Sequence, residues 1–501
     1  MKQTLIAFAL GGLAAGSAQA GPTFSADKLW TYNHAGTPNA PGQMSEISAY
    51  DAATGTIWVA GVVGVDVLNA KTGQLVQHID TSSLGNINSV AIRNGVAAFA
   101  IEDKLTRTNN GLVQFYDTTS RAATGSVTVG ALPDMLTFTP DGSKLLVANE
   151  GTPSTYGARI GSSVPFQFAA AATDPQGSVS IIDMATRTLA ATAALSGVPT
   201  TGSHIRSNTG MDYEPEYIAV NSAGTKAYVS LQEANAMGVL NLTTNTFEKV
   251  VGLGVKDFRQ VGNEIDPKNN GTISFGTQAV KGFYMPDGMA TFSSGGKTFI
   301  AMANEGDFRE DDGDRSSAGN STFKATSPLD SLRIANTDSS PGDLYVAGAR
   351  SFSIRDENGN LVYDSGSILD RKAAEKGIYD DGRSRDKGVE PEGVTIIEIN
   401  GRTLIFVGLE RTTKSAIAVF DITDPRDVEY LDMIVSDTDL SPEGVAAFMA
   451  DGQYFLSVAN EVSNTTSLYR LNMVPEPHAL ALTLGGLGLL GFNLRRRCKA
   501  V

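Results

Sequence analysis

Short apolar runs separated by polar turn residues make up most of this chain. The runs are rich in Val, Ile, Leu and aromatic residues, and clusters of Gly, Asn, Asp, Ser and Thr stand between them. Short runs bounded by turn residues are typical of strands. Residues 368–378 carry the best pattern for a helix, and that helix would be short. Residues 21–473 are therefore predicted to form one all-β domain.

An acidic phrase recurs seven times in this domain and marks the start of a structural unit. Its clearest copies read Pro-Asp-Gly at 286–288 and Pro-Glu-Gly at 391–393 and 442–444. Each opens an apolar strand, and a second strand follows after a turn and ends in another acid. The seven copies start at Glu46, Ser89, Asp134, Glu216, Asp287, Glu392 and Glu443. Copies without an insertion between them lie about 43 to 51 residues apart, which is the size of a four-stranded propeller blade.

The repeat predicts a seven-bladed β-propeller of four-stranded blades. The last unit has three strands, and residues 28–33, ahead of the first repeat, have the alternating pattern of a strand. We expect this N-terminal strand to complete the last blade and close the ring, which leaves no open sheet edge. Inserted loops are expected at 151–177, 254–283 and 306–345, with a long connection at 364–388. Loops of this length usually carry function.

Propeller geometry predicts that acids gather at one end of the central channel. The first strand of each blade lines the channel, and its start lies beside the end of the antiparallel second strand. Two rows of acids should therefore converge on one channel mouth. The rows are Glu46, Asp134, Glu216, Asp287, Glu392 and Glu443, and Glu102, Glu150, Glu233, Glu305, Glu410 and Glu461.

So many carboxylates need cations, shared protons or basic partners. The chain has four histidines and one cysteine, so an oxygen-bound hard cation is favoured, with Ca²⁺ first and Mg²⁺ second. A purely structural role stays open, in which the acids fix turns by bonding backbone N–H groups or Arg309, Arg315 and Arg411. The candidate metal ligands are Glu216, Asp287, Glu305, Asp307, Glu392, Glu410, Glu443 and Glu461.

The N-terminus has the pattern of a secretory signal peptide. Lys2, an apolar core at 5–13 and the small residues of Ala18-Gln19-Ala20 predict export and cleavage after residue 20. The alternative, an uncleaved anchor, would need a longer apolar core to span a bilayer.

The other end, residues 474–501, resembles the PEP-CTERM sorting signal of Gram-negative bacteria that make exopolysaccharide. Its apolar segment, 479–494, would insert transiently in the inner membrane with the arginines on the cytoplasmic side. The resemblance implies cleavage by an exosortase and delivery to the cell surface or extracellular matrix; an ordinary tail anchor is the alternative. The residues that carry the resemblance are Pro475, Glu476, Pro477, Arg495, Arg496 and Arg497.

Removal of both ends makes the protein more acidic. The full chain has a formal net charge of −15, and the ends carry five basic residues, so about −20 remains. Nucleic acid is excluded as a partner because its phosphates demand a basic surface. The single cysteine, Cys498, lies in the tail, so the processed protein has neither disulfides nor thiol chemistry.

Several short motifs together resemble the choice-of-anchor I family. They lie at 214–216, 286–288, 303–307, 383–388, 390–393 and 441–444. Members are bacterial secreted propellers with various C-terminal anchors, related to mesenchyme-specific surface glycoprotein-like proteins. Some relatives are labelled alkaline phosphatase or phytase-like esterase. The resemblance covers residues 24–472 and implies a propeller at the cell surface, but it assigns no activity.

Two functions remain open from the sequence. The first is a non-enzymatic surface or matrix protein that binds polysaccharide or another surface protein through its acidic face. The second is a secreted metal-dependent phosphoesterase with Asp307, Asp311, Asp312, Glu392 and Glu443 as ligands. The basic groups that would bind a phosphate are Arg309, Arg315, Arg383, Arg385 and Lys387. Basic groups held over the channel mouth favour the esterase, whereas basic groups paired with acids favour binding.

Overall fold

The structure is a computed structural model that describes residues 23–153, 175–206, 213–308 and 315–474. The chain divides into two compact units, one formed by Ala26–Leu471 and the other by its two ends. The predicted signal peptide and sorting tail lie outside the described residues. In the part that is described, no helix is long and apolar enough to cross a membrane.

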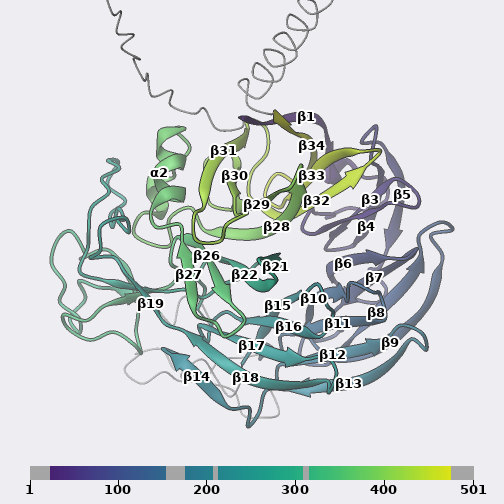
Figure 1. Ribbon diagram of the computed structural model, residues 1–501, viewed down its shortest axis with the longest axis horizontal. Helices are drawn as coiled ribbons and strands as arrows, with labels where there is room; N and C mark the ends of the chain where they lie inside the picture. Colours follow the sequence, from purple (N-terminus) through teal and green to yellow (C-terminus); the bar gives the residue numbers. More distant parts are fainter. Residues whose placement is uncertain (1–22, 154–174, 207–212, 309–314, 475–501) are drawn as a thin grey trace, which may run out of the picture. The chain divides into compact units, whose positions relative to one another are not determined.

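The unit Ala26–Leu471 is a β-propeller, as predicted (Figure 1). Within the described residues, seven blade sheets follow one another along the chain, and the first three strands of each blade pair antiparallel in chain order. The innermost strands are β2 (Ser48–Asp51), β6 (Ile87–Arg93), β10 (Pro133–Phe138), β15 (Pro215–Val220), β21 (Met289–Ser294), β28 (Pro391–Ile399) and β32 (Pro442–Ala450). The second strands are β3 (Thr56–Gly61), β7 (Val96–Ile101), β11 (Lys144–Asn149), β16 (Lys226–Leu231), β22 (Lys297–Asn304), β29 (Arg402–Leu409) and β33 (Gln453–Asn460).

The outer half of each blade is built the same way. The third strands are β4 (Gly64–Asn69), β8 (Asn110–Asp117), β12 (Ser178–Asp183), β17 (Ala236–Asn241), β26 (Ser351–Asp356), β30 (Ser415–Asp421) and β34 (Thr465–Val474). The outermost strands are β5 (Leu75–Asp80), β9 (Ala123–Ala131), β13 (Thr188–Ala194), β18 (Thr246–Leu253), β27 (Leu361–Asp364), β31 (Glu429–Ser436) and β1 (Thr23–Asn33). In blade 4 a fifth strand, β14 (Thr200–Ser203), runs parallel to β18.

The hydrophobic core lies between neighbouring blades. Second and third strands are buried on both faces because a blade covers each side, so their apolar runs are continuous rather than alternating. Trp58 of blade 1 packs against Phe99 of blade 2 with ring centroids 6.0 Å apart, and Phe352 meets Phe420 across blades 5 and 6 at 4.7 Å. Each such side chain contributes about 1.5–3 kcal/mol of burial free energy.

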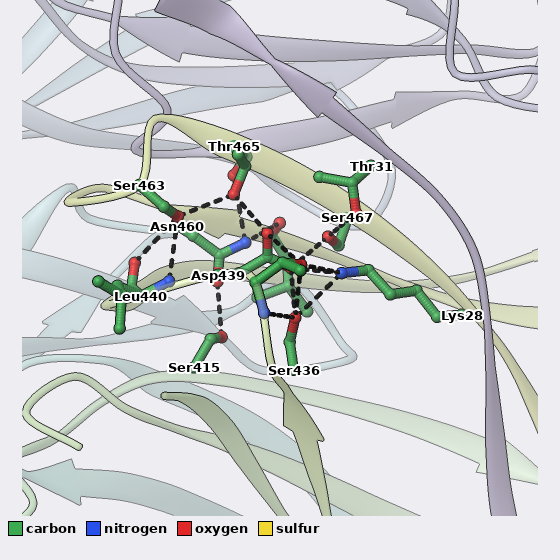
Figure 2. A network of polar contacts seen from close by, with 12 residues as sticks. Lys28, Thr31, Ser415, Ser436, Asp439, Leu440, Asn460, Ser463, Thr465 and Ser467 are labelled. Atoms are coloured by element: carbon green, nitrogen blue, oxygen red, sulfur yellow. Dashed lines mark hydrogen bonds and ion pairs between the residues drawn. The ribbon is translucent and has the colours of Figure 1, made fainter. Parts of the chain in front are cut away.

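The ring closes through β1, as predicted from residues 28–33. Strand β1 forms the outer edge of the last sheet, in the order β1-β34-β33-β32. Figure 2 shows the polar network beneath it, which is centred on Asp439. Lys28 Nζ on β1 lies 2.6 Å from the buried Asp439 Oδ2, and the hydroxyls of Ser436 and Ser467 each donate to the same oxygen at 2.7 Å. The network therefore joins β1, blade 7 and the end of blade 6.

Substituting Asp439 should weaken this closure. Asp439→Asn removes the charge that Lys28 pairs with and leaves buried hydroxyl donors poorly matched, so the free energy of unfolding is expected to fall by about 2 kcal/mol. Lys28→Met should cost less, because the Lys28 side chain is 30% exposed and its partner keeps four hydroxyl donors. Urea unfolding measures both. An equal loss in the two variants would contradict a central role for Asp439.

The inserted segments form structure that the repeat does not predict. Strands β19 (Val255–Asp257), β20 (Lys281–Phe283) and β25 (Tyr345–Val346) make a small sheet, and β23 (Arg315–Ser317) pairs with β24 (Arg333–Ala335). These segments share their own apolar core. The expected helix is α2 (Ile368–Glu375), which ends just before Gly377. Two short 3-10 turns lie at His34–Gly36 and Asp381–Arg383.

Candidate functional site

The innermost strands of all seven blades line a central cavity of about 560 Å³. Its walls carry Ala219, Thr395 and Ala446, while Asp287 and Glu392 belong to its acidic end. The motif acids therefore lie where the repeat predicts them, at the starts of the channel strands.

A β-bulge at the start of the channel strands directs these acids. In blade 7, Pro442 pairs with Asn460 and the next pair is Val445 with Val458, so Glu443 and Gly444 together oppose one residue. The same shift occurs at the starts of β10, β15 and β28. A bulge bends a strand and redirects a side chain. The Pro-acid phrase is therefore the sequence of a bulge that turns a carboxylate toward the channel end.

The glycine after the acid allows neighbouring channel strands to approach closely. A Cβ on Gly288, Gly393 or Gly444 would lie 2.3, 2.1 or 2.2 Å from a carbonyl oxygen of the next blade. Those oxygens belong to Glu392, Glu443 and Glu46 respectively. Each acid of this arc thus has its backbone pressed against the preceding blade's glycine. This contact keeps the backbones of successive channel strands close together at the acids.

The two rows of acids meet as antiparallel pairing requires. The backbone N–H groups of Glu150, Glu410 and Glu461 each donate to a carbonyl oxygen at the start of the channel strand of the same blade, at 2.9 Å. The acceptors are Leu132, Glu390 and Ser441, which precede the motif proline. These three residues and Met285 have φ between 44° and 56°, a left-handed conformation that costs roughly 1–2 kcal/mol for a non-glycine residue.

Burial and mutual repulsion raise the pKa values of the channel carboxyls. Burial, followed by the charge of neighbouring acids, raises the pKa of Glu46 to about 7 and that of Asp134 to about 8. The pKa values of Glu216, Asp287, Glu392 and Glu443 are raised well above the ordinary range for the same two reasons. For these four acids, the charged groups with the largest effects on the pKa are all other carboxylates. The four side chains are half-buried, and those of Asp287, Glu392 and Glu443 belong to residues that line the cavity.

Two carboxylate oxygens at this end have no hydrogen-bond donor. Oε2 of Glu216 and Oε2 of Glu392 are buried and accept no hydrogen bond in the described part of the chain. An unsatisfied buried carboxylate oxygen is costly unless a proton or a cation satisfies it. A proton or a bound cation would satisfy these two oxygens.

A second acidic cluster lies beside the channel end, and here every acid has a basic partner. One oxygen each of Glu305, Glu390 and Glu410 lies within 4.8 Å of the others, a spacing that could hold a metal ion. Lys387 Nζ is 2.8 Å from Glu305 Oε1 and 3.0 Å from Glu390 Oε2. Arg383 Nε donates to Glu390 at 2.7 Å. An ion pair between Arg411 and Glu410, 2.6 Å long, completes the set.

The predicted site residues divide between these two clusters. Glu216, Asp287, Glu392 and Glu443 belong to the channel ring, and the charge of Glu461 raises the pKa of Glu443. Glu305 and Glu410 belong to the second cluster. Asp307 lies close enough to raise the pKa of Asp287. Sequence reasoning missed Glu390 as a site residue. Its signal was an acid directly before the Pro-Glu-Gly phrase, a position that holds Glu214 in one other copy and Leu132, Met285 or Ser441 in three more.

The predicted anion-binding residues are mostly engaged with acids. Arg383 and Lys387 pair with Glu390, and Arg315 Nη1 lies 2.9 Å from Asp386 Oδ1. The backbone carbonyl of Arg385 accepts a hydrogen bond from Arg333. Arg309, Asp311 and Asp312 lie outside the described residues.

The fold and the acidic channel define a propeller in which four of the channel strands, β10, β15, β28 and β32, begin in bulged Pro-acid phrases. Residues 46–425 match the choice-of-anchor I domain, and residues 474–497 match the PEP-CTERM protein-sorting motif. The chain belongs to the choice-of-anchor I family. Its sorting motif implies processing by an exosortase and marks a secreted, surface-sorted protein.

Among the solved structures, the similarity to hydrazine synthase supports the fold alone. Hydrazine synthase of Kuenenia stuttgartiensis is similar with a TM-score of 0.50 and 12% identity, over 87% of this chain and 98% of that one. The WD40 domain of Toxoplasma gondii coronin has a TM-score of 0.49 and 10% identity, over 91% and 87%. No curated protein sequence matches the chain.

Proposed function

We propose that this protein is a non-enzymatic, surface-sorted binding propeller whose acidic channel end holds a divalent cation. Ca²⁺ is the preferred ion because it accepts many carboxylate oxygens in irregular geometry, and Mg²⁺ is second because it demands a near-octahedral site. The proposed ligands are Glu216, Asp287, Glu392 and Glu443, with Glu461 beside them. The bound ion would supply open coordination positions to an extracellular ligand.

The observation that carries this proposal is that acids dominate the surroundings of the channel ring: among the described residues, the charged groups that most shift the pKa values of Glu216, Asp287, Glu392 and Glu443 are all carboxylates. The groups that raise the pKa of Glu392 are Glu410, Glu443, Glu305 and Asp287, all acids, and one Glu392 oxygen is buried without a donor. The adjacent Glu305–Glu390–Glu410 cluster, by contrast, has a lysine and two arginines. Basic residues of the protein balance the acids of the Glu305–Glu390–Glu410 cluster, whereas we propose that a bound cation balances the acids of the channel ring.

The pairing of the basic residues favours binding over ester hydrolysis. A phosphoesterase needs cationic groups that face a substrate phosphate beside the metal. Arg383, Lys387 and Arg315 instead engage Glu390, Glu305 and Asp386. A phosphate would have to compete with these carboxylates for its partners.

The sorting motif indicates where in the cell the protein would bind its ligand. After exosortase cleavage we expect the propeller on the outer surface of a Gram-negative cell or in its extracellular matrix. The ligand proposed for it is an extracellular polysaccharide or another surface protein. Both carry the hydroxyl or carboxylate oxygens that complete a Ca²⁺ coordination shell.

Calcium is expected to raise the melting temperature of the metal-free protein at pH 8. An ion that binds the folded state stabilises it by about 2.7 kcal/mol at 100 times its Kd. Glu392→Gln should reduce this shift because it removes one charged ligand, and Mg²⁺ should give a smaller shift than Ca²⁺. Differential scanning fluorimetry measures all three.

The matched control is Glu429→Gln, which removes an acid that is exposed on the outer strand β31. Its calcium response should equal that of the wild type. A phosphomonoester assay accompanies the titration. If calcium gives no shift, the cation site is rejected. If a metal-dependent hydrolysis appears and Glu392→Gln abolishes it, the protein is an esterase instead.

A further inference from the structure

Lys387 contacts two of the three acids of the second acidic cluster. Its ammonium group lies between Glu305 and Glu390 at 2.8 and 3.0 Å, and the third acid, Glu410, has an oxygen within 4.8 Å of theirs. The residue is 8% exposed, so its charge is held inside the protein rather than in solvent. Three carboxylates in this arrangement are otherwise the oxygen set of a hard cation.

We propose that Lys387 is a tethered cation that excludes divalent ions from the Glu305–Glu390–Glu410 cluster. Resting on the proposed function, the same exclusion confines the bound ion to the channel ring. Lys387 is thus the residue that determines how many ions this end of the propeller takes.

The backbone around Lys387 is held from both sides. Arg350 Nη2 donates to the carbonyl oxygens of Ser384 and Asp386 at 2.6 and 2.9 Å, just before the lysine. The backbone N–H of Val389, just after it, donates to Asp370 Oδ1 at 3.2 Å. Arg350 and Asp370 are both 1% exposed. Buried groups on both flanks therefore fix where the lysine side chain begins.

Close packing at Gly388 adds to this restraint. Gly388 has a φ of 69°, and a Cβ there would lie 2.8 Å from Asp370 Oδ1. The loop can therefore come this near to α2 only with glycine after the lysine. An ordinary surface lysine has no such support: Lys414 pairs with Asp437 with side chains 44% and 82% exposed.

Charge explains why a divalent ion does not displace the lysine. Glu305, Glu390 and Glu410 are balanced by Lys387, Arg383 and Arg411, so the cluster is close to neutral. An entering ion would have to expel a positioned ammonium group and leave it buried without a partner, which is strongly unfavourable. Replacing the lysine by an uncharged side chain of similar size leaves the three acids one positive charge short, so that their oxygens can bind a divalent ion.

The test counts bound calcium ions in Lys387→Met. Equilibrium dialysis of the metal-free protein against Ca²⁺, followed by atomic absorption, should find one more ion per chain in Lys387→Met than in the wild type. Adding Glu305→Gln to that variant should remove the extra ion. Lys414→Met, which removes an exposed lysine, is the matched control and should bind as many ions as the wild type. Equal counts in folded Lys387→Met and wild type overturn the proposal.

Separate outcomes distinguish this inference from the proposed function. If the wild type binds no calcium while Lys387→Met binds one ion, the channel site fails and the tethered cation stands. If the wild type loses its ion with Glu305→Gln but keeps it with Glu392→Gln, the ion already occupies the second cluster, and the tethered cation is rejected. Lys387→Gln serves as a second variant, with folding checked by circular dichroism. If neither variant folds without calcium and calcium does not restore folding, the proposal is also overturned.

Discussion

Replacing Gly393 with alanine is expected to destabilise the propeller severely. The added Cβ would lie 2.1 Å from the carbonyl oxygen of Glu443, which is backbone of the next blade and cannot rotate away. This steric clash can be removed only if blades 6 and 7 move apart where they form the channel. The expected loss exceeds about 4 kcal/mol, in the range of severe overpacking. Urea unfolding followed by tryptophan fluorescence measures it.

The matched control is Gly36→Ala, a glycine with no atom within 4 Å of its added Cβ and no left-handed φ. Its effect should stay within about 0.5 kcal/mol. Gly288→Ala and Gly444→Ala should resemble Gly393→Ala, since their Cβ atoms would lie 2.3 and 2.2 Å from equivalent carbonyls. If Gly393→Ala is as mild as the control, the blades are not in backbone contact at the channel.

These glycines show which part of the fold a sequence pattern can predict. The spacing of the acidic phrase predicts seven blades because each copy is one supersecondary unit, and the strand β1 follows from the missing fourth strand of the last unit. The glycine after the acid suggests a turn when met in sequence. Its actual reason is a carbonyl oxygen of the neighbouring blade, 50 residues away for Gly393 and 104 for Gly288, which local propensity does not encode.

The site was predictable in outline for a similar reason. Antiparallel pairing places the two rows of acids side by side, and this follows from strand order alone. The pairing of Lys387 with Glu305 does not, because the lysine comes from a loop after α2 and its position depends on the buried Arg350 and Asp370. The sequence also did not predict that the inserted segments pair with each other through β20 and β25, because this pairing depends on packing outside the repeat.

The metal-free protein is expected to lose stability as the pH rises from 5 to 8. The channel carboxyls have pKa values raised in the folded state, to about 7 for Glu46 and about 8 for Asp134, whereas in the unfolded chain they titrate near pH 4. Between these limits the folded state binds more protons than the unfolded state. The free energy of unfolding therefore falls with increasing pH, and the stabilisation present at pH 5 is lost by pH 8.

The size of this loss is on the order of several kcal/mol in total, after allowance for water in the channel and for coupling between the carboxyls. The melting temperature should fall by roughly 5 °C or more between pH 5 and pH 8. Carboxyls with lowered pKa values do not interfere, because Asp141 and Asp257, each at about 2, are fully ionised throughout this range. Calorimetry in EDTA at closely spaced pH values measures the slope.

Calcium should flatten this slope, since the carboxylates that repel one another at pH 8 are the proposed ligands of the ion. Glu392→Gln separates the two effects. In EDTA at pH 8 it should raise the melting temperature above that of the wild type, because it removes a charge from a ring of charges, yet with calcium its gain should be smaller. A wild type whose stability in EDTA rises from pH 5 to pH 8 would mean that the channel carboxylates are already compensated. In that case the structural role of the acids, rather than the cation site, would explain the repeat.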